Sequence, residues 1–188
     1  MNKTKVTKPL NLSEFSDWAL VPKGDRDTVK AEVAEFVIDS ILDALGDATS
    51  PVLDAGKFDP LSSKYAKFKK GFSSSGTANM ELTGEMLDAL TWKNLGGNSL
   101  EVGWLDAEQA GKAHGHTTGY KHLPERKLMP NAKEHFEDDI ETGIGEIIAS
   151  FAEEPDDQDD QTSDPITPQI SAAAETFGDG IFAGLFGG

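Results

Sequence analysis

The sequence predicts an α+β fold, in which a small, hairpin-based antiparallel sheet packs against a long N-terminal helix and a long C-terminal helix. Two stretches carry apolar residues at every third or fourth position, which is typical of amphipathic helices. Between them, apolar and polar residues alternate around a Gly-Gly-Asn turn, which is typical of a β-hairpin. We therefore expect one domain over residues 28–151 of the 188-residue chain, flanked by an extended N-terminal arm and a C-terminal tail.

The first helix is expected within DRDTVKAEVAEFVIDSILDALGD, residues 25–47. Asp27 or Thr28 is suited to cap its start, and Gly46 is suited to end it. Apolar residues at every third or fourth position form a stripe along this helix, which predicts that one face of it is buried. The stripe consists of Val29, Val33, Phe36, Val37, Ile41, Ala44 and Leu45.

A short basic helix is expected after Asp59-Pro60, because a capping carboxylate followed by proline is typical of a helix start. Its apolar residues are predicted to face the core, and Gly71 to end it. Lysines interleaved with aromatics are suited to touch nucleic-acid phosphate, but the small net charge of residues 1–133 favours an ordinary surface helix. The apolar residues are Leu61, Tyr65 and Phe68, and the lysines are Lys64, Lys67, Lys69 and Lys70.

The hairpin is expected in LTWKNLGGNSLEVGWL, residues 90–105, with Gly96-Gly97-Asn98 as its turn. Trp92 on the first strand is expected to face the apolar residues of the second, which are Leu100, Val102 and Trp104. Two short helices flank the hairpin. One begins near Thr83 with Met86, Leu87 and Leu90 inward, and the other is expected within DAEQAGKAHG, residues 106–115, with Asp106 as its cap.

The closing helix is expected within residues 131–151, after a possible short strand at residues 126–130. Gly143 and Gly145 lower its helix propensity and indicate close packing on one side. Its apolar positions recur every three or four residues: Phe136, Ile140, Ile144, Ile147 or Ile148, and Phe151.

Charge divides the chain unevenly. Residues 1–133 hold all 17 Lys and Arg against 18 acids, whereas residues 134–188 hold 15 acids and no Lys or Arg. The acids and prolines of residues 152–169 predict a linker that buries nothing. The apolar, glycine-rich residues 170–188 are expected to be a docking peptide, and an acidic linker opposes binding to anionic lipid. Its candidate partner-docking residues are Ile181, Phe182, Leu185 and Phe186.

Composition excludes several classes of site. The chain has no cysteine, which excludes disulfides, thiol nucleophiles and thiolate metal sites. The basic start lacks the apolar core of a secretory signal, and no apolar run reaches the roughly 18 residues of a membrane span. We expect a soluble protein made inside the cell. Residues 1–27 mix lysine and threonine with isolated apolar residues and prolines, and we expect them to form an arm that is pinned on a neighbouring surface, either of its own chain or of a partner.

The histidines of KAHGHTTGYKHLPERKLMP, residues 112–130, are the main candidates for chemistry. His114, His116 and His122, with Glu125, could supply the ligands of a catalytic zinc ion that keeps an open position. An H-x-H pair needs an extended backbone for both rings to reach one metal, so a polar loop is the favoured interpretation. Because the chain also lacks nucleophile-elbow, P-loop and dinucleotide motifs, we expect no catalytic residues, no metal and no cofactor.

The order of these helices, the hairpin and the histidine-rich loop resembles the order of elements in the tail-completion proteins of tailed bacteriophages, also called virion morphogenesis proteins. The resemblance covers roughly residues 28–151, as four short motifs in series. The spacing from His114 to Gly119 is longer than in the family, and residues 126–130 lack its aromatic residue. The matching positions are Leu61, Ser62, Tyr65 and Lys69; Leu82, Thr83, Gly84 and Met86; Ala110 or Ala113, His114 and Gly119; and Pro124, Arg126, Leu128 and Pro130.

The resemblance implies a structural virion protein without catalytic activity, assembled in the host cytoplasm. It implies a homo-oligomeric ring, expected to be a hexamer, at the neck of the virion, where it finishes the tail and joins it to the head around the DNA channel. Head-completion or connector proteins and the tail tube are its implied partners, DNA passes without specific binding, and no membrane is involved. The expected subunit-interface residues are His114, Gly119, Tyr120, Pro124 and Arg126.

Two other functions remain open on the sequence. One is a metal-dependent hydrolase that uses the three histidines of residues 112–130. The other is an adaptor or membrane-active protein that acts through its apolar C-terminus.

Overall fold

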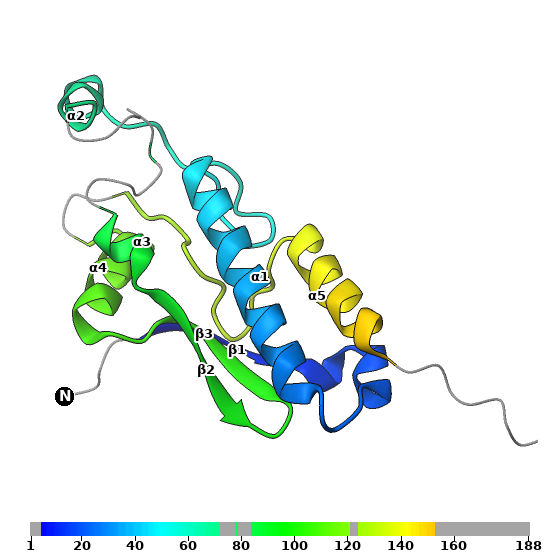
Figure 1. Ribbon diagram of the computed structural model, residues 1–188. Helices are drawn as coiled ribbons and strands as arrows, with labels where there is room; N and C mark the ends of the chain where they lie inside the picture. Colours follow the sequence, from blue (N-terminus) through cyan, green and yellow to red (C-terminus); the bar gives the residue numbers. More distant parts are fainter. Residues whose placement is uncertain (1–4, 72–77, 79–83, 121–123, 153–188) are drawn as a thin grey trace, which may run out of the picture. The chain divides into compact units, whose positions relative to one another are not determined.

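Alternating apolar residues build a three-stranded antiparallel sheet in the order β1-β3-β2 (Figure 1). The strands are β1 (Val6–Asn11), β2 (Leu90–Gly96) and β3 (Ser99–Trp104). The computed structural model describes residues 5–71, 78, 84–120 and 124–152. The α+β class and the small antiparallel sheet are therefore confirmed.

The register places the apolar residues of all three strands on one face. Leu100, Val102 and Trp104 alternate along β3 and are fully buried. Val102 lies opposite Trp92 of β2, as the sequence predicts. On the opposite face Glu101 accepts a hydrogen bond from the Thr7 hydroxyl at 2.8 Å. The sheet thus has one core face and one polar face, which is common in antiparallel sheets.

Gly103 allows β1 and β3 to approach closely. A Cβ atom there would lie 2.4 Å from the carbonyl oxygen of Val6, and its φ of 148° is one that side chains rarely adopt. Any larger residue would push the strands apart.

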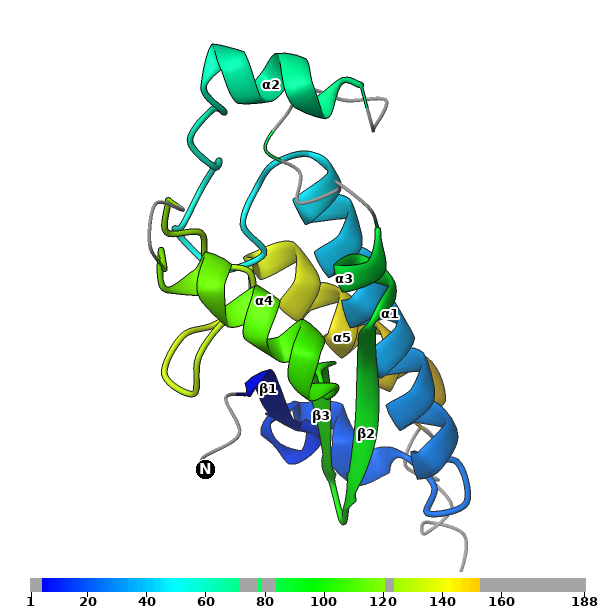
Figure 2. The same cartoon turned by 90° about the vertical axis from the view of Figure 1, so that its left-hand side faces the viewer.

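One long helix covers the core face of the sheet, and a second packs beside it. α1 (Arg26–Gly46) contacts β2 and β3, and α5 (Asp138–Phe151) lies beside α1 (Figures 1 and 2). The two helices meet where a Cβ atom on Gly143 would lie 2.2 Å from the ring of Phe36. The predicted close packing on one side of the closing helix is therefore found at Gly143, whereas Gly145 has only ordinary contact with Phe15, at 3.8 Å.

The start of α1 differs in detail from the prediction. Its N-cap residue is Asp25, whose side chain makes no capping hydrogen bond, rather than Asp27 or Thr28. The helix ends at Gly46, as predicted, and the left-handed residue that follows is Ala48, with a φ of 56°. Capping preferences locate helix ends only to within a few residues.

Residues 6–21, expected to belong to an arm, are part of the folded unit. β1 pairs with β3 over its whole length, and two 3₁₀ turns follow at Leu12–Glu14 and Ser16–Leu20. Leu12, Trp18 and Val21 are buried in the core. Pro9 is tolerated because β1 is an edge strand, where a missing N–H costs no ladder bond.

The basic helix begins later than Pro60. α2 (Ser63–Lys69) is capped by Ser62, whose hydroxyl accepts a hydrogen bond from the Tyr65 N–H at 3.4 Å. The prediction that Tyr65 and Phe68 face the core is wrong, because they are 43% and 53% exposed. Their rings stack on each other with centroids 6.0 Å apart.

The short helices α3 (Glu85–Asp88) and α4 (Ala107–Thr117) flank the hairpin. Trp104 donates its indole N–H to the Met86 carbonyl at 2.6 Å, which ties β3 to α3. Leu90, expected within the first of these helices, begins β2 instead.

All described residues belong to one unit, Met1–Pro155, and the second unit is Asp156–Gly188. The expected apolar docking peptide and its residues Ile181, Phe182, Leu185 and Phe186 lie outside the described residues. Among the helices that the structure describes, none combines the length and the apolar character needed to cross a bilayer.

Candidate functional site

The histidine-rich segment is helical over much of its length. α4 is capped by the Asp106 carboxylate, which accepts hydrogen bonds from the N–H groups of Glu108 and Gln109 at 2.9 and 3.0 Å. The Gln109 N–H is the main cause of a lowered pKa for the Asp106 carboxyl. The predicted cap is confirmed, but the helix continues past the expected end at Gly115 to Thr117 and therefore includes His116 as well as His114.

Gly119 ends α4. Its φ is 64°, and the N–H of the next residue, Tyr120, donates to the Gly115 carbonyl at 2.9 Å. Gly119 itself donates to the His116 carbonyl at 3.4 Å. These two bonds form a Schellman motif, for which a left-handed glycine is the favoured residue. Gly119 therefore has a defined role in the backbone, which is to reverse the chain after α4.

The helix separates the two described histidines of the metal alternative. His114 and His116 are two positions apart, which is about 200° around an α-helix. His114 is exposed and His116 is half-buried. His122 lies outside the described residues, and no group of three His, Asp or Glu side chains within them is arranged to hold a metal ion. The geometry of α4 therefore does not bring the first two proposed ligands together.

His116 and Arg126 form a partly buried pair. The backbone N–H of Arg126 donates to the backbone carbonyl of His116 at 2.9 Å. The Arg126 guanidinium lies 5.8 Å from the centroid of the Phe58 ring. Burial, with a smaller contribution from the Arg126 charge, lowers the pKa of His116. Burial also lowers the pKa of Arg126, and Asp59 opposes that shift. His116 is thereby favoured in its neutral form.

Each side chain of this pair has one buried nitrogen atom without a hydrogen bond to the described part of the chain. Within the described residues, neither His116 Nδ1 nor Arg126 Nε has a hydrogen bond although both atoms are buried. The Arg126 guanidinium instead lies over the Phe58 ring in a cation–π arrangement.

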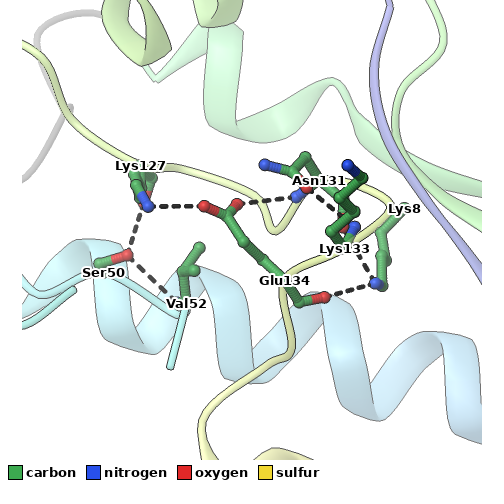
Figure 3. Close-up of polar contacts among 7 residues, drawn as sticks. All are labelled: Lys8, Ser50, Val52, Lys127, Asn131, Lys133 and Glu134. Carbon is green, nitrogen blue, oxygen red and sulfur yellow. Dashed lines mark hydrogen bonds and ion pairs between the residues drawn. The ribbon is translucent and has the colours of Figure 1, made fainter. Parts of the chain in front are cut away.

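A polar network holds the segment that follows Arg126 (Figure 3). Glu134 accepts from the Lys127 ammonium and, at 3.0 Å, from the Asn131 N–H. The Asn131 N–H and the Lys127 ammonium lower the pKa of the Glu134 carboxyl. Lys8 of β1 donates to the carbonyls of Asn131 and Glu134 at 3.1 and 2.6 Å. The network therefore ties residues 127–134 to the edge strand.

Ser50 fastens the same segment to the loop after α1. Its hydroxyl donates to the Lys127 carbonyl at 2.7 Å and accepts from the Val52 N–H at 3.1 Å (Figure 3). Residues 126–130, predicted as a short strand, are not in a strand. They have no regular secondary structure, and Leu128 and Met129 are buried in the core. Side-chain bonds replace the strand pairing that the sequence led us to expect.

The five predicted interface residues do not share one environment. His114, Tyr120 and Pro124 are exposed, Tyr120 by 61%, whereas Gly119 is half-buried. Arg126 is only 5% exposed and is covered by its own chain. A neighbouring subunit would therefore meet His114, Tyr120 and Pro124 before it met Arg126.

A groove of 540 Å³ is lined by β1, by the end of the hairpin and by the start of α5 with the segment before it. Leu10, Phe15 and Ile144 supply apolar lining, and His135 and Glu141 form a pair with 3.1 Å between Nδ1 and Oε1. Ser99 also lines the groove, but no hydrogen bond joins it to His135 within the described residues. Sequence reasoning did not predict this groove, because its walls come from segments more than a hundred residues apart.

A second groove, of 340 Å³, lies between the C-terminal half of α1 and the start of α5. Four carboxylates line it, and none of its described lining residues is Lys or Arg. Two acids four positions apart, at the end of α1 and directly after it, are the sequence feature that could have indicated this groove. They are Asp43 and Asp47, and α5 and the residue before it add Asp139 and Glu137.

Comparison with protein-family models, with curated proteins and with solved structures finds no match to this chain.

Proposed function

We propose that the protein is a structural subunit of a tailed-bacteriophage virion, which forms a ring at the neck and joins the tail to the head around the DNA channel. In this proposal the ring is homo-oligomeric, a hexamer by the resemblance. Its neighbours are head-completion or connector proteins and the tail tube. The apolar C-terminal peptide is a tether to another virion protein.

The order of the family motifs along one α+β unit carries the proposal. Several motif residues have roles that hold their elements in place. Gly84, with a φ of 81°, precedes α3, and Gly119 ends α4. Ala110 and Ala113 are the buried residues of α4. Few other residues are tolerated where the backbone is left-handed or where a side chain must be small. The order of the motifs that contain these residues is therefore more specific than any single motif.

The surface supports an assembly role. A ring requires two different patches on each subunit, which meet head to tail. The exposed aromatic and basic residues of α2 and the exposed acids of α1 lie on separate elements and are unlike in charge. Such surfaces favour contact between different faces of identical subunits.

Native mass spectrometry and negative-stain imaging of the purified full chain test the proposal. We expect a ring of defined stoichiometry, either in solution or after addition of isolated phage tails. Immunogold labelling of virions is expected to mark the junction of head and tail. A chain that stays monomeric at every concentration and never joins particles would contradict the proposal.

A further inference from the structure

α2 presents aromatic and basic side chains on one exposed helix. Tyr65 and Phe68 stack on each other and are 43% and 53% exposed. Lys64, Lys67 and Lys70 are also exposed. Within the described residues, none of these three lysines forms an ion pair with an acid. Large exposed aromatics beside charges are typical of surfaces that bind a partner.

α1 presents the opposite charge on its outer face. Its exposed acids recur at spacings of three and four, so they form one stripe along the helix. The stripe, Glu32, Glu35, Asp39 and Asp43, leads into the 340 Å³ groove that Asp43, Asp47, Glu137 and Asp139 line. The negative end of the α1 dipole lies at this end of the stripe and adds to its potential.

We propose that α2 of one subunit docks on the acidic stripe of α1, and over the groove beside α5, in a second copy of this chain. The proposal rests on the proposed ring and names the two surfaces that would meet at each of its joints. Lys64 and Lys67 would pair with Asp39 and Asp43 of the next copy. Tyr65 and Phe68 would cover the apolar atoms that Ala44 and Ile140 contribute to the groove.

Charge and symmetry favour a second copy as the occupant. The basic helix and the acidic stripe occur on the same chain in unlike places, so each copy offers one of each to its two neighbours. Exposed ion pairs alone give little affinity, and burial of the two aromatic rings supplies the larger share. The pairs instead set which faces meet and how fast they associate.

Nucleic acid is the alternative occupant of α2. Phosphate would attract the same lysines, and bases would stack on the same aromatics. The acids of α1 and α5 have no role in that alternative and would repel DNA. We therefore assign α2 to the protein contact and treat DNA binding as an outcome of the test.

A charge exchange tests the contact in the full chain. Lys64→Glu/Lys67→Glu is expected to weaken self-association about tenfold or more in sedimentation at low salt. Asp39→Lys/Asp43→Lys is expected to do the same, and an equimolar mixture of the two variants is expected to recover association. Lys23→Glu/Lys93→Glu is the control for the α2 variant, because it makes the same change in net charge at exposed residues outside α2. It is expected to leave association unchanged.

Cysteine cross-linking gives an independent measurement, because the chain has no cysteine of its own. A Lys67→Cys chain mixed with a differently tagged Asp43→Cys chain is expected to form the mixed disulfide dimer under mild oxidation. Lys93→Cys in place of Lys67→Cys is the matched control and is expected to give none. Circular dichroism checks that each variant is folded.

Three results would overturn the inference. In the first, both charge variants associate as strongly as the unaltered chain. In the second, the mixture of the two variants does not recover association. In the third, the α2 variant loses DNA binding and keeps its self-association. If a ring still forms in any of these cases, the proposed function stands and only the joint is wrong. If the unaltered chain forms no ring even with tails, the proposed function itself fails.

Discussion

At the scale of single residues, the environment of His116 determines its charge. Its ring lies beside Arg126, and its buried Nδ1 has no hydrogen-bond partner within the described residues. Both burial and the neighbouring positive charge disfavour the imidazolium form, so the pKa of His116 is lowered. Protonation of this residue therefore favours the unfolded chain, in which the imidazole is hydrated.

The pH dependence of stability follows with a definite sign. As pH falls through the unfolded-state pKa of about 6.5, the unfolded chain takes up a proton that folded His116 does not. The free energy of unfolding therefore falls from pH 7.5 towards the lowered pKa and then levels off. His116→Gln removes this part of the loss, so its decline between pH 7.5 and 5 is expected to be smaller than that of the unaltered chain.

Urea denaturation at several pH values measures this difference. His114→Gln is the matched control, because His114 is exposed on the same helix. It is expected to retain the full decline. Equal declines for His116→Gln and the unaltered chain would show that His116 is not held neutral.

At the scale of elements, the crossing of α1 and α5 depends on one missing side chain. Phe36 of α1 occupies the place that a Cβ atom on Gly143 would need. Phe36 is half-buried, and it adds this local fit to a core that already contains fully buried side chains of both helices, such as Ile41 and Ile144. The two glycines of α5 are equivalent in the sequence pattern and different in the structure.

Gly143→Ala and Gly145→Ala distinguish the glycine that is needed for close packing from the glycine that is not. The first is expected to lower the free energy of unfolding by about 1–3 kcal/mol, because Phe36 or the helix must move. The second is expected to raise it by about 0.5–1 kcal/mol, because alanine favours a helix and meets Phe15 only at 3.8 Å. Thermal unfolding of both variants measures the contrast, and equal shifts would contradict the crossing described here.

At the scale of the whole molecule, the N-terminal segment completes the core. β1 brings Val6 and Leu10 onto the buried face of the sheet, and Lys8 onto the loop that follows Arg126. The unit therefore depends on contacts that join the first strand to residues near position 100 and position 131.

A chain that lacks residues 1–11 tests this dependence. Loss of the buried Val6 and Leu10 alone is expected to cost about 3–6 kcal/mol, at about 1.5–3 kcal/mol for each side chain. We expect loss of cooperative unfolding or aggregation, because the edge of β3 becomes exposed. A chain that lacks only residues 1–4 keeps β1 and is the control. Cooperative unfolding of the shorter chain at an unchanged midpoint would contradict the role of β1.

Local patterns in the sequence were sufficient for the α+β class, the hairpin with its turn, and the Asp106 cap, because each depends on residues within a few positions of one another. They did not place His114 and His116 on one helix, since the histidine-rich composition suggested a loop. They also did not place Arg126 in the interior, because burial depends on Phe58 and on the network around Glu134, which sequence spacing does not reveal.

The sequence by itself determined the periodic elements of this protein, since helical and strand periods are local properties of the chain. Only the tertiary structure decided that β1 joins the sheet, because the partner of Thr7 lies 94 residues away at Glu101. It also decided that Tyr65 and Phe68 are exposed. The period of α2 shows that they share a face, but whether that face meets the core depends on where the rest of the chain lies.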